Sequence, residues 1–156
     1  MARRMFLKTI GAVGYMIQYG CIAHCTLHYI GDFVICAGPS MQPTITDNDI
    51  LLTNHMTVNR FNVERGDVVI AKSPVNPKTL VCKRVVGLEG DVIRDGFSKH
   101  FVPRGHVWLE GDNKDNSTDS RTYGPVPYGL LKSKAFYKIW PVEDMGTLNR
   151  TVLTSR

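Results

Sequence analysis

One serine stands between two prolines, in the segment Gly38-Pro39-Ser40-Met41-Gln42-Pro43-Thr44 that follows an apolar run. Proline fixes φ, so Ser40 is expected in a rigid turn at the end of a strand, with Gly38, Pro39 and Met41 around it. Such a turn exposes a hydroxyl in a fixed direction, as a nucleophile requires. Ordinary surface turns share this pattern, so Ser40 is a candidate nucleophile only if the chain also supplies a base.

A lysine that could be this base, Lys83, lies inside the otherwise apolar residues 81–86. On a strand, Lys83 shares a face with Val81 and Val85. Burial disfavours the ammonium form and lowers the pKa of a lysine from about 10.4, which turns the amine into a base near neutral pH. Arg84 has equally apolar neighbours on the other face, so periodicity does not decide which of the two points inward. Lys83 could also reach water at a sheet edge.

A third segment, residues 111–125, is dense in turn formers and polar side chains, including Ser117, Asp119 and Arg121. It lacks the ligand spacing and central glycine of a calcium-binding EF-hand loop. The four cysteines form no C-x-x-C pair and have no histidines at metal-binding spacing, so we interpret them as free buried thiols. The sequence predicts no metal and no cofactor.

The formal net charge is +5, but the basic residues are scattered and form no block or stripe interleaved with aromatic side chains. An excess of basic residues by itself indicates only that the protein is soluble and attracts anionic molecules without specificity. We therefore expect a solvated basic surface and no nucleic-acid partner.

Residues 9–31 contain no Asp, Glu, Lys or Arg, and they follow a basic flank with Arg3, Arg4 and Lys8. About 20 helical residues cross a bilayer core of ~30 Å, although Gln18 and two histidines make this segment weakly apolar. A cleaved secretory signal would be shorter, and a buried core helix would leave the basic flank unexplained. Residues 1–32 are therefore predicted to be an uncleaved anchor with its basic flank on the inner side of the membrane.

From residue 33 onward, short β-branched runs alternate with Gly, Pro, Asn and Asp, and no segment after residue 40 has a sustained helical period. This pattern predicts a mainly β domain over residues 33–145, built as a coiled or barrel-like sheet, with residues 146–156 as a tail. Strands are expected at 33–36, 50–53, 67–71, 80–86, 91–93 and 106–109.

Four segments, taken in order, resemble the motifs of the type I signal peptidase family. They are the Ser40 turn at 38–44 and residues 65–71, 82–91 and 111–125, within a resemblance that spans about 33–130. The resemblance implies a mainly β peptidase domain with one N-terminal transmembrane helix. It also implies that Ser40 attacks the scissile carbonyl and that neutral Lys83 takes its proton and later returns one to the leaving amine. Ser117 would orient the lysine amine, and Asp119 and Arg121 would brace the site by pairing their charges.

The position two residues before the nucleophile departs from the family. Many bacterial members carry a serine there whose hydroxyl helps to form the oxyanion hole, and this chain has Gly38. Loss of one such donor costs about 10²–10³ in rate when nothing replaces it. Backbone N–H groups, including that of Ser40, or another group must therefore donate the hydrogen bonds to the oxyanion.

Within the family, the short distance from Lys83 to Trp108 excludes the large inserted domain of many bacterial members. Lysine as base separates the chain from the enzymes of the eukaryotic secretory pathway. The basic N-terminus and the motifs resemble the mitochondrial members, which have two catalytic subunits, and residues 14–25 and 116–121 favour the first. This resemblance implies an inner-membrane enzyme that faces the intermembrane space, acts on precursors with cleavable sorting signals, and pairs with the second catalytic subunit as a heterodimer.

Two other functions fit parts of the sequence. Self-cleaving repressors share the serine–lysine chemistry, but they need no anchor, and the sequence offers no plausible linker bond for self-cleavage before Ser40. The chain could also be a catalytically weak or inactive partner that stabilises an active peptidase. The presence of Ser40, Lys83, Ser117, Asp119 and Arg121 argues against this role, whereas Gly38 keeps it open.

Overall fold

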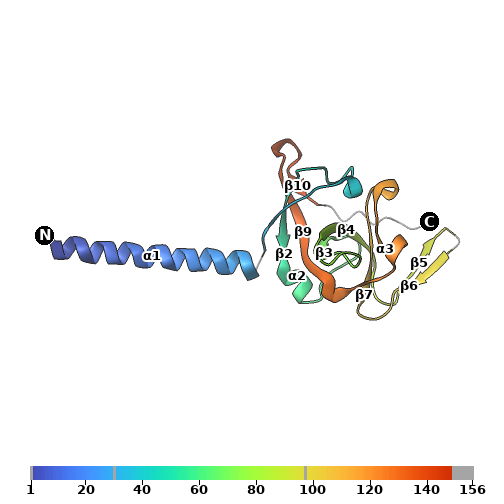
Figure 1. Cartoon of the computed structure of the whole chain (residues 1–156), viewed down its shortest axis with the longest axis horizontal. Coiled ribbons are helices and arrows are strands. Elements are labelled where there is room, and N and C mark those ends of the chain that lie inside the picture. The colour runs from blue at the N-terminus through green and yellow to red at the C-terminus, as the bar shows by residue number, and fades with distance from the viewer. Residues whose placement is uncertain (1, 30, 97, 149–156) are drawn as a thin grey trace.

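The computed structural model describes residues 2–29, 31–96 and 98–148. A long helix, α1 (Ala2–Tyr29), extends as a separate rod from a β-rich body (Figure 1). Among the described residues, no helix combines the length and the apolarity of a membrane span. The anchor expected in residues 1–32 therefore stays a prediction. Of the expected tail at 146–156, residues 149–156 lie outside the described ranges.

The body is mainly β, as expected, and nearly all of its strands belong to one antiparallel sheet with the order β1-β2-β9-β3-β4-β7-β8. Apart from these strands the body contains only short helical turns, including α2 (His55–Asn59) and α3 (Ser120–Tyr123). The sheet strands are β1 (Phe33–Ile35), β2 (Ile50–Asn54), β3 (Val68–Lys72), β4 (Leu80–Gly87), β7 (His106–Glu110), β8 (Val126–Pro127) and β9 (Leu131–Trp140).

Two further pairings complete the β structure. The strands β5 (Val92–Asp95) and β6 (Ser98–Phe101) form a separate hairpin that projects on the side opposite α1 (Figure 1). The short strand β10 (Gly146–Thr147) adds to β9.

The longest strand, β9, was not predicted, and it lies in the middle of the sheet between β2 and β3. Two of its lysines point toward buried carboxylates. Lys134 pairs with Asp67 and Lys138 pairs with Asp49, each with a nitrogen–oxygen distance of 2.8 Å. Lysines at these two positions interrupt the alternation of apolar and polar residues by which a strand is usually recognised in a sequence.

The sheet is buried on both faces, because alternate residues of β3 enter different clusters. Val69 and Ala71 join the largest cluster, which also holds Val85 of β4 and Leu109 of β7. Val68 joins a second cluster, whose other buried members are Cys36, Met41, Ile45, Leu51 and Ala135. A coiled sheet buries both faces in this way, and the second cluster fixes the turn that carries Ser40.

Candidate active site

Ser40 is the middle residue of a short 3₁₀ turn, η1 (Pro39–Met41), that follows β1. The turn is fixed on one side by Met41, whose side chain is 2% exposed within the second cluster. On the other side Gly38 has φ +103°, a backbone conformation that side chains disfavour. Its N–H donates to Asp47 Oδ1. The half-buried Ser40 is thus held in a rigid turn, as the two prolines predict.

Lys83 is buried on β4, with 3% of its surface exposed, and it lies opposite Val69 of β3. No carboxylate of the described residues lies within ion-pairing distance of its amine. Burial lowers the pKa of Lys83 from its ordinary value, the Asp119 carboxylate opposes this shift, and the Arg121 cation adds to it. The amine is thus biased toward its neutral, proton-accepting form.

Arg84, the other candidate for an inward-pointing cation, is also buried but fully paired. Its Nε and one terminal nitrogen donate to the two oxygens of Asp112 at 2.8 and 2.6 Å, and the other terminal nitrogen donates to Gly66 O at 2.8 Å. Lys83 and Arg84 are thus both buried, and they differ in whether they have a carboxylate partner. Arg84 ties β4 to the polar segment at Asp112, and Lys83 is left without a counter-ion.

Gly111 brings the polar segment into contact with the Ser40 turn. A Cβ placed on Gly111 would lie 2.4 Å from Ser40 O and 2.3 Å from Ser117 Oγ, so only glycine fits. Asn113 N donates to Ser40 O at 3.1 Å. The η1 turn also contacts β4, the strand of Lys83. Three separate segments thus bring Ser40, Lys83 and Ser117 to one place.

The hydroxyl of Ser117 is buried near the Asp119 carboxylate and helps to lower the pKa of that carboxyl, but it forms no well-aligned hydrogen bond with any of the described residues. A buried polar atom without a partner costs free energy, and such atoms in native structures often have a functional explanation. Ser117 Oγ is therefore only weakly held by Asp119 and can also bond a group that is charged or repositioned during a reaction.

Asp119 and Arg121 form a buried support beneath this segment. Asp119 is fully buried and accepts from Arg121 Nε at 2.9 Å, from the Arg121 terminal nitrogen at 2.8 Å and from Gly111 N at 3.0 Å. Burial alone would raise the pKa of Asp119, but these donors outweigh it, and the pKa lies below its usual range. The carboxylate therefore stays ionised and fixes Gly111.

A serine hydroxyl in a fixed turn, next to a strand with a buried lysine of lowered pKa, can attack a carbonyl carbon once the amine removes its proton. No group of three or more metal-binding side chains occurs in the described ranges. Sequence reasoning did not find the Arg84–Asp112 pair or the packing of Gly111. The Gly111-Asp112-Asn113 motif was the available signal, but its contacts depend on the fold.

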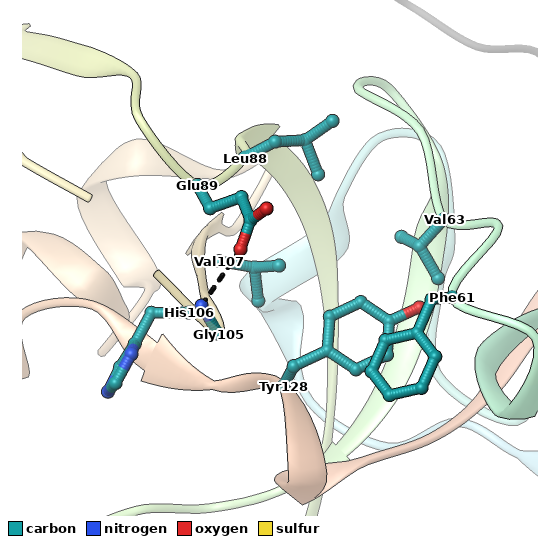
Figure 2. Close-up of a pocket in the computed structure, with 8 residues that line it drawn as sticks. All are labelled: Phe61, Val63, Leu88, Glu89, Gly105, His106, Val107 and Tyr128. Carbon is teal, nitrogen blue, oxygen red and sulfur yellow. Dashed lines mark hydrogen bonds between the residues drawn. The ribbon is translucent and has the colours of Figure 1, made fainter. Parts of the chain in front are cut away.

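An apolar pocket of about 260 Å³ lies elsewhere on the body (Figure 2). Phe61 stacks on Tyr128 at its rim with a ring separation of 4.8 Å, and Val63, Leu88 and Val107 complete its apolar wall. None of the candidate catalytic residues lines this pocket, so it is not where the serine and the lysine meet.

The coiled β body brings a serine in a fixed turn close to a strand with a buried lysine, and serine–lysine pairs are one known variant of the serine hydrolase site. The model of the family described as "Signal peptidase, peptidase S26" matches residues 9–97 and 93–140. The chain belongs to this family, and it is a signal peptidase-type serine protease.

Its relatives include mitochondrial enzymes. Human "Mitochondrial inner membrane protease subunit 1" is 55% identical over 154 residues, which cover 95% of this chain and 93% of the relative. The Arabidopsis thaliana "Mitochondrial ATP-independent inner membrane protease subunit 1a" is 41% identical, with 87% and 86% covered. The mouse "Mitochondrial inner membrane protease subunit 2" is 45% identical, with 88% and 77% covered. These relatives support a protease of the mitochondrial inner membrane.

Proposed function

We propose that the chain is an endopeptidase that removes sorting sequences from precursors delivered to the mitochondrial intermembrane space, with Ser40 as nucleophile and Lys83 as general base. The observation that carries this proposal is the state of Lys83. It is a buried lysine without a carboxylate partner, its pKa is lowered, and its strand contacts the Ser40 turn.

In the first step, neutral Lys83 Nζ takes the proton of Ser40 Oγ as the oxygen attacks the scissile carbonyl carbon. The resulting ammonium gives a proton to the leaving amine, and the acyl group stays on Ser40. Water then attacks the acyl-enzyme, again with Lys83 as base. Ser117 Oγ, which is buried beside Asp119 without a well-aligned hydrogen bond, is available to hold the amine in line during both proton transfers.

The oxyanion hole must be built without a side chain at Gly38. The Gly38 N–H already donates to Asp47, so it is not free for the oxyanion. No described group accepts a hydrogen bond from the N–H of Ser40. We therefore assign the Ser40 N–H as the main oxyanion donor, which compensates in part for the absent hydroxyl.

The remaining parts of the proposal concern location and partner. Residues 1–32 form the membrane anchor with Arg3, Arg4 and Lys8 on the inner side, and the peptidase domain of residues 33–145 faces the intermembrane space. The second catalytic subunit is the partner in a heterodimer. Supporting this, relatives are named both as subunit 1 and as subunit 2 of a mitochondrial inner membrane protease.

The test expresses the full chain with its presumed partner in membranes and supplies an unprocessed precursor. Ser40→Ala and Lys83→Ala are each expected to lower the cleavage rate by about 10³-fold or more, because nucleophile and base act as a unit. The matched controls Ser98→Ala and Lys72→Ala change exposed residues of the same types and are expected to cleave normally.

Two results would contradict the proposal. Cleavage by Lys83→Ala but not by Ser40→Ala would assign the base to another residue. If the wild-type chain cleaves no precursor while its partner does, the chain is an inactive partner subunit.

Arg121→Gln is expected to shift the acidic limb of the pH profile of kcat/KM to higher pH. Arg121 is one of the charges that lower the pKa of Lys83, whereas Asp119 raises it. Removing the cation leaves Asp119 unopposed, so the pKa of Lys83 rises and less of the amine is neutral at pH 7. Activity should fall at neutral pH and recover as the pH is raised.

The measurement is kcat/KM against pH, with the exposed Arg94→Gln as a matched control. An unchanged acidic limb in Arg121→Gln, together with reduced activity at every pH, would show that Lys83 is not the group that titrates.

A further inference from the structure

Two of the four cysteines, Cys36 and Cys82, lie together in the second cluster beside Met41. Both thiols are free, and they are joined by a hydrogen bond. The expectation of buried thiols throughout the chain was wrong for Cys21 and Cys25, which are exposed on α1. These exposed cysteines provide a natural comparison for the pair of the buried Cys36 and the half-buried Cys82.

The thiol contact joins parts of the sheet that are not neighbours. Cys36 follows β1 and Cys82 lies on β4, and the strands β2, β9 and β3 separate β1 from β4 in the sheet. Cys36 stands four residues before Ser40, and Cys82 directly precedes Lys83. The pair is therefore a point where the nucleophile segment and the base strand touch through their side chains.

We propose that Cys36 and Cys82 form a reversible redox switch, whose disulfide cross-links the nucleophile segment to the base strand and inactivates the peptidase. This inference rests on the proposed function of Ser40 and Lys83. In this proposal, the activity of that site depends on the ratio of thiols to disulfides in the surrounding compartment.

The oxidant is a low-molecular-weight disulfide such as oxidised glutathione. The Cys36 thiolate attacks one sulfur of that disulfide and expels one thiolate. Cys82, after losing its proton, attacks the Cys36 sulfur of the mixed disulfide and expels the second thiolate. The two cysteines lose two electrons and two protons in total, and the oxidant becomes two thiols. The hydrogen bond from Cys82 lowers the pKa of Cys36, which makes Cys36 the attacking thiol.

Access to Cys36 depends on local opening, because its side chain is 7% exposed. β1 is a three-residue strand at the edge of the sheet, and it pairs only with β2. Short edge segments open at much lower free energy than the whole fold, so the oxidant can reach the pair without global unfolding.

The disulfide is inactivating for geometric reasons. A disulfide brings its sulfurs to about 2.05 Å. Hydrogen-bonded thiols lie farther apart, so the bond must pull the segment before Ser40 and the residue before Lys83 toward each other. A misplacement of about 1 Å at reacting groups costs about 10²-fold in rate. Reduction restores the spacing in which the Ser40 turn rests on Met41.

The test uses the full chain with its partner in membranes, equilibrated with glutathione buffers of increasing oxidised fraction. Two quantities are followed separately. Mass spectrometry of a non-reducing digest measures the Cys36–Cys82 linked peptide, and precursor cleavage measures activity. The linked fraction is expected to rise as the cleavage rate falls, by about tenfold or more, and dithiothreitol should reverse both changes.

Cys36→Ala is expected to cleave at the wild-type rate in reducing buffer and to keep that rate in oxidising buffer. The matched control, Cys21→Ala with Cys25→Ala, removes the two exposed thiols and should keep the full redox response. If Cys36→Ala impairs the folded chain, Cys82→Ala serves as the second variant with the same expectation.

The outcomes separate this inference from the proposed function. If no linked peptide forms, or if it forms while cleavage that depends on Ser40 is unchanged, the switch is overturned and the peptidase stands. If the linked peptide forms but the reduced chain cleaves nothing, the proposed function fails, and the switch fails with it.

Discussion

Lys83→Met is expected to abolish precursor cleavage and, at the same time, to stabilise the folded chain. Loss of the general base lowers the rate by about 10²–10⁴-fold. The stabilisation arises because wild-type Lys83 is 3% exposed and has no carboxylate partner. Methionine fills a similar volume without an amine to desolvate. Replacing buried charges by apolar residues of similar volume is neutral or stabilises by about 1–4 kcal/mol.

The direction of the pH dependence follows from the lowered pKa of Lys83. Between the folded pKa and the unfolded pKa near 10.5, the unfolded chain binds more protons than the folded chain. The wild-type free energy of unfolding therefore rises with pH in this window, and Lys83 costs stability below it. The advantage of Lys83→Met should be largest below the folded pKa of Lys83 and should shrink as the pH rises toward 10.

Thermal unfolding at several pH values measures this effect. A gain of 1 kcal/mol corresponds to a rise in Tm of roughly 2–4 °C for a chain of this size. Lys72→Met, at an exposed position on β3, is the matched control and should change neither activity nor the pH dependence. A Lys83→Met variant that is less stable than wild type would indicate that the lysine has a counter-ion in solution.

The second large effect is expected for Gly111→Ala, which should reduce cleavage by about 10²-fold or more. The new methyl group would overlap Ser40 O at 2.4 Å and Ser117 Oγ at 2.3 Å. Because Ser40 O is backbone, the clash cannot be relieved by rotating a side chain. Either the nucleophile turn or the Ser117 segment must move, and overpacking of this kind also destabilises by about 1–3 kcal/mol.

Gly129→Ala is the matched control, since nothing lies within 4 Å of a Cβ at that position. It is expected to cleave and unfold like wild type. The measurements are kcat/KM and the free energy of unfolding from denaturant titration. Normal cleavage by Gly111→Ala would mean that Ser40 and Ser117 are not held together by this glycine during catalysis.

The sequence predicted the strands that are rich in β-branched residues, including β4, in which valines flank the buried Lys83 and Arg84. β3 is a run of β-branched residues, and its boundaries differ from the prediction by one residue. β9 was missed because Lys134 and Lys138 face Asp67 and Asp49, while Phe136 and Trp140 are exposed. Leu131 and Ala135 are buried as in an ordinary strand, but Lys138 takes a buried position farther along. The buried carboxylates that pair with Lys134 and Lys138 lie more than 60 residues earlier in the chain.

In the candidate site, too, features set by neighbouring residues could be predicted, and features set by residues far apart in the sequence could not. The rigidity of the Ser40 turn follows from its two prolines and could be predicted. The choice between Lys83 and Arg84 could not, because it depends on Asp112, which pairs with Arg84 across 28 residues of sequence. The contact between Cys36 and Cys82 had no local signal, because it arises only when the sheet coils.

The position of β9 in the sheet affects when, during synthesis of the chain, the active site can form. In the hydrogen-bonded order of the described sheet, β9 lies between β1 and β2, next to the Ser40 turn, and β3 and β4, which carries Lys83. β9 begins at Leu131, after Ser40, Lys83 and Ser117 have all been synthesised. A chain emerging from a ribosome or a translocation channel thus carries every reactive group before it can align them. We therefore expect proteolytic activity to begin only after the C-terminal part has arrived.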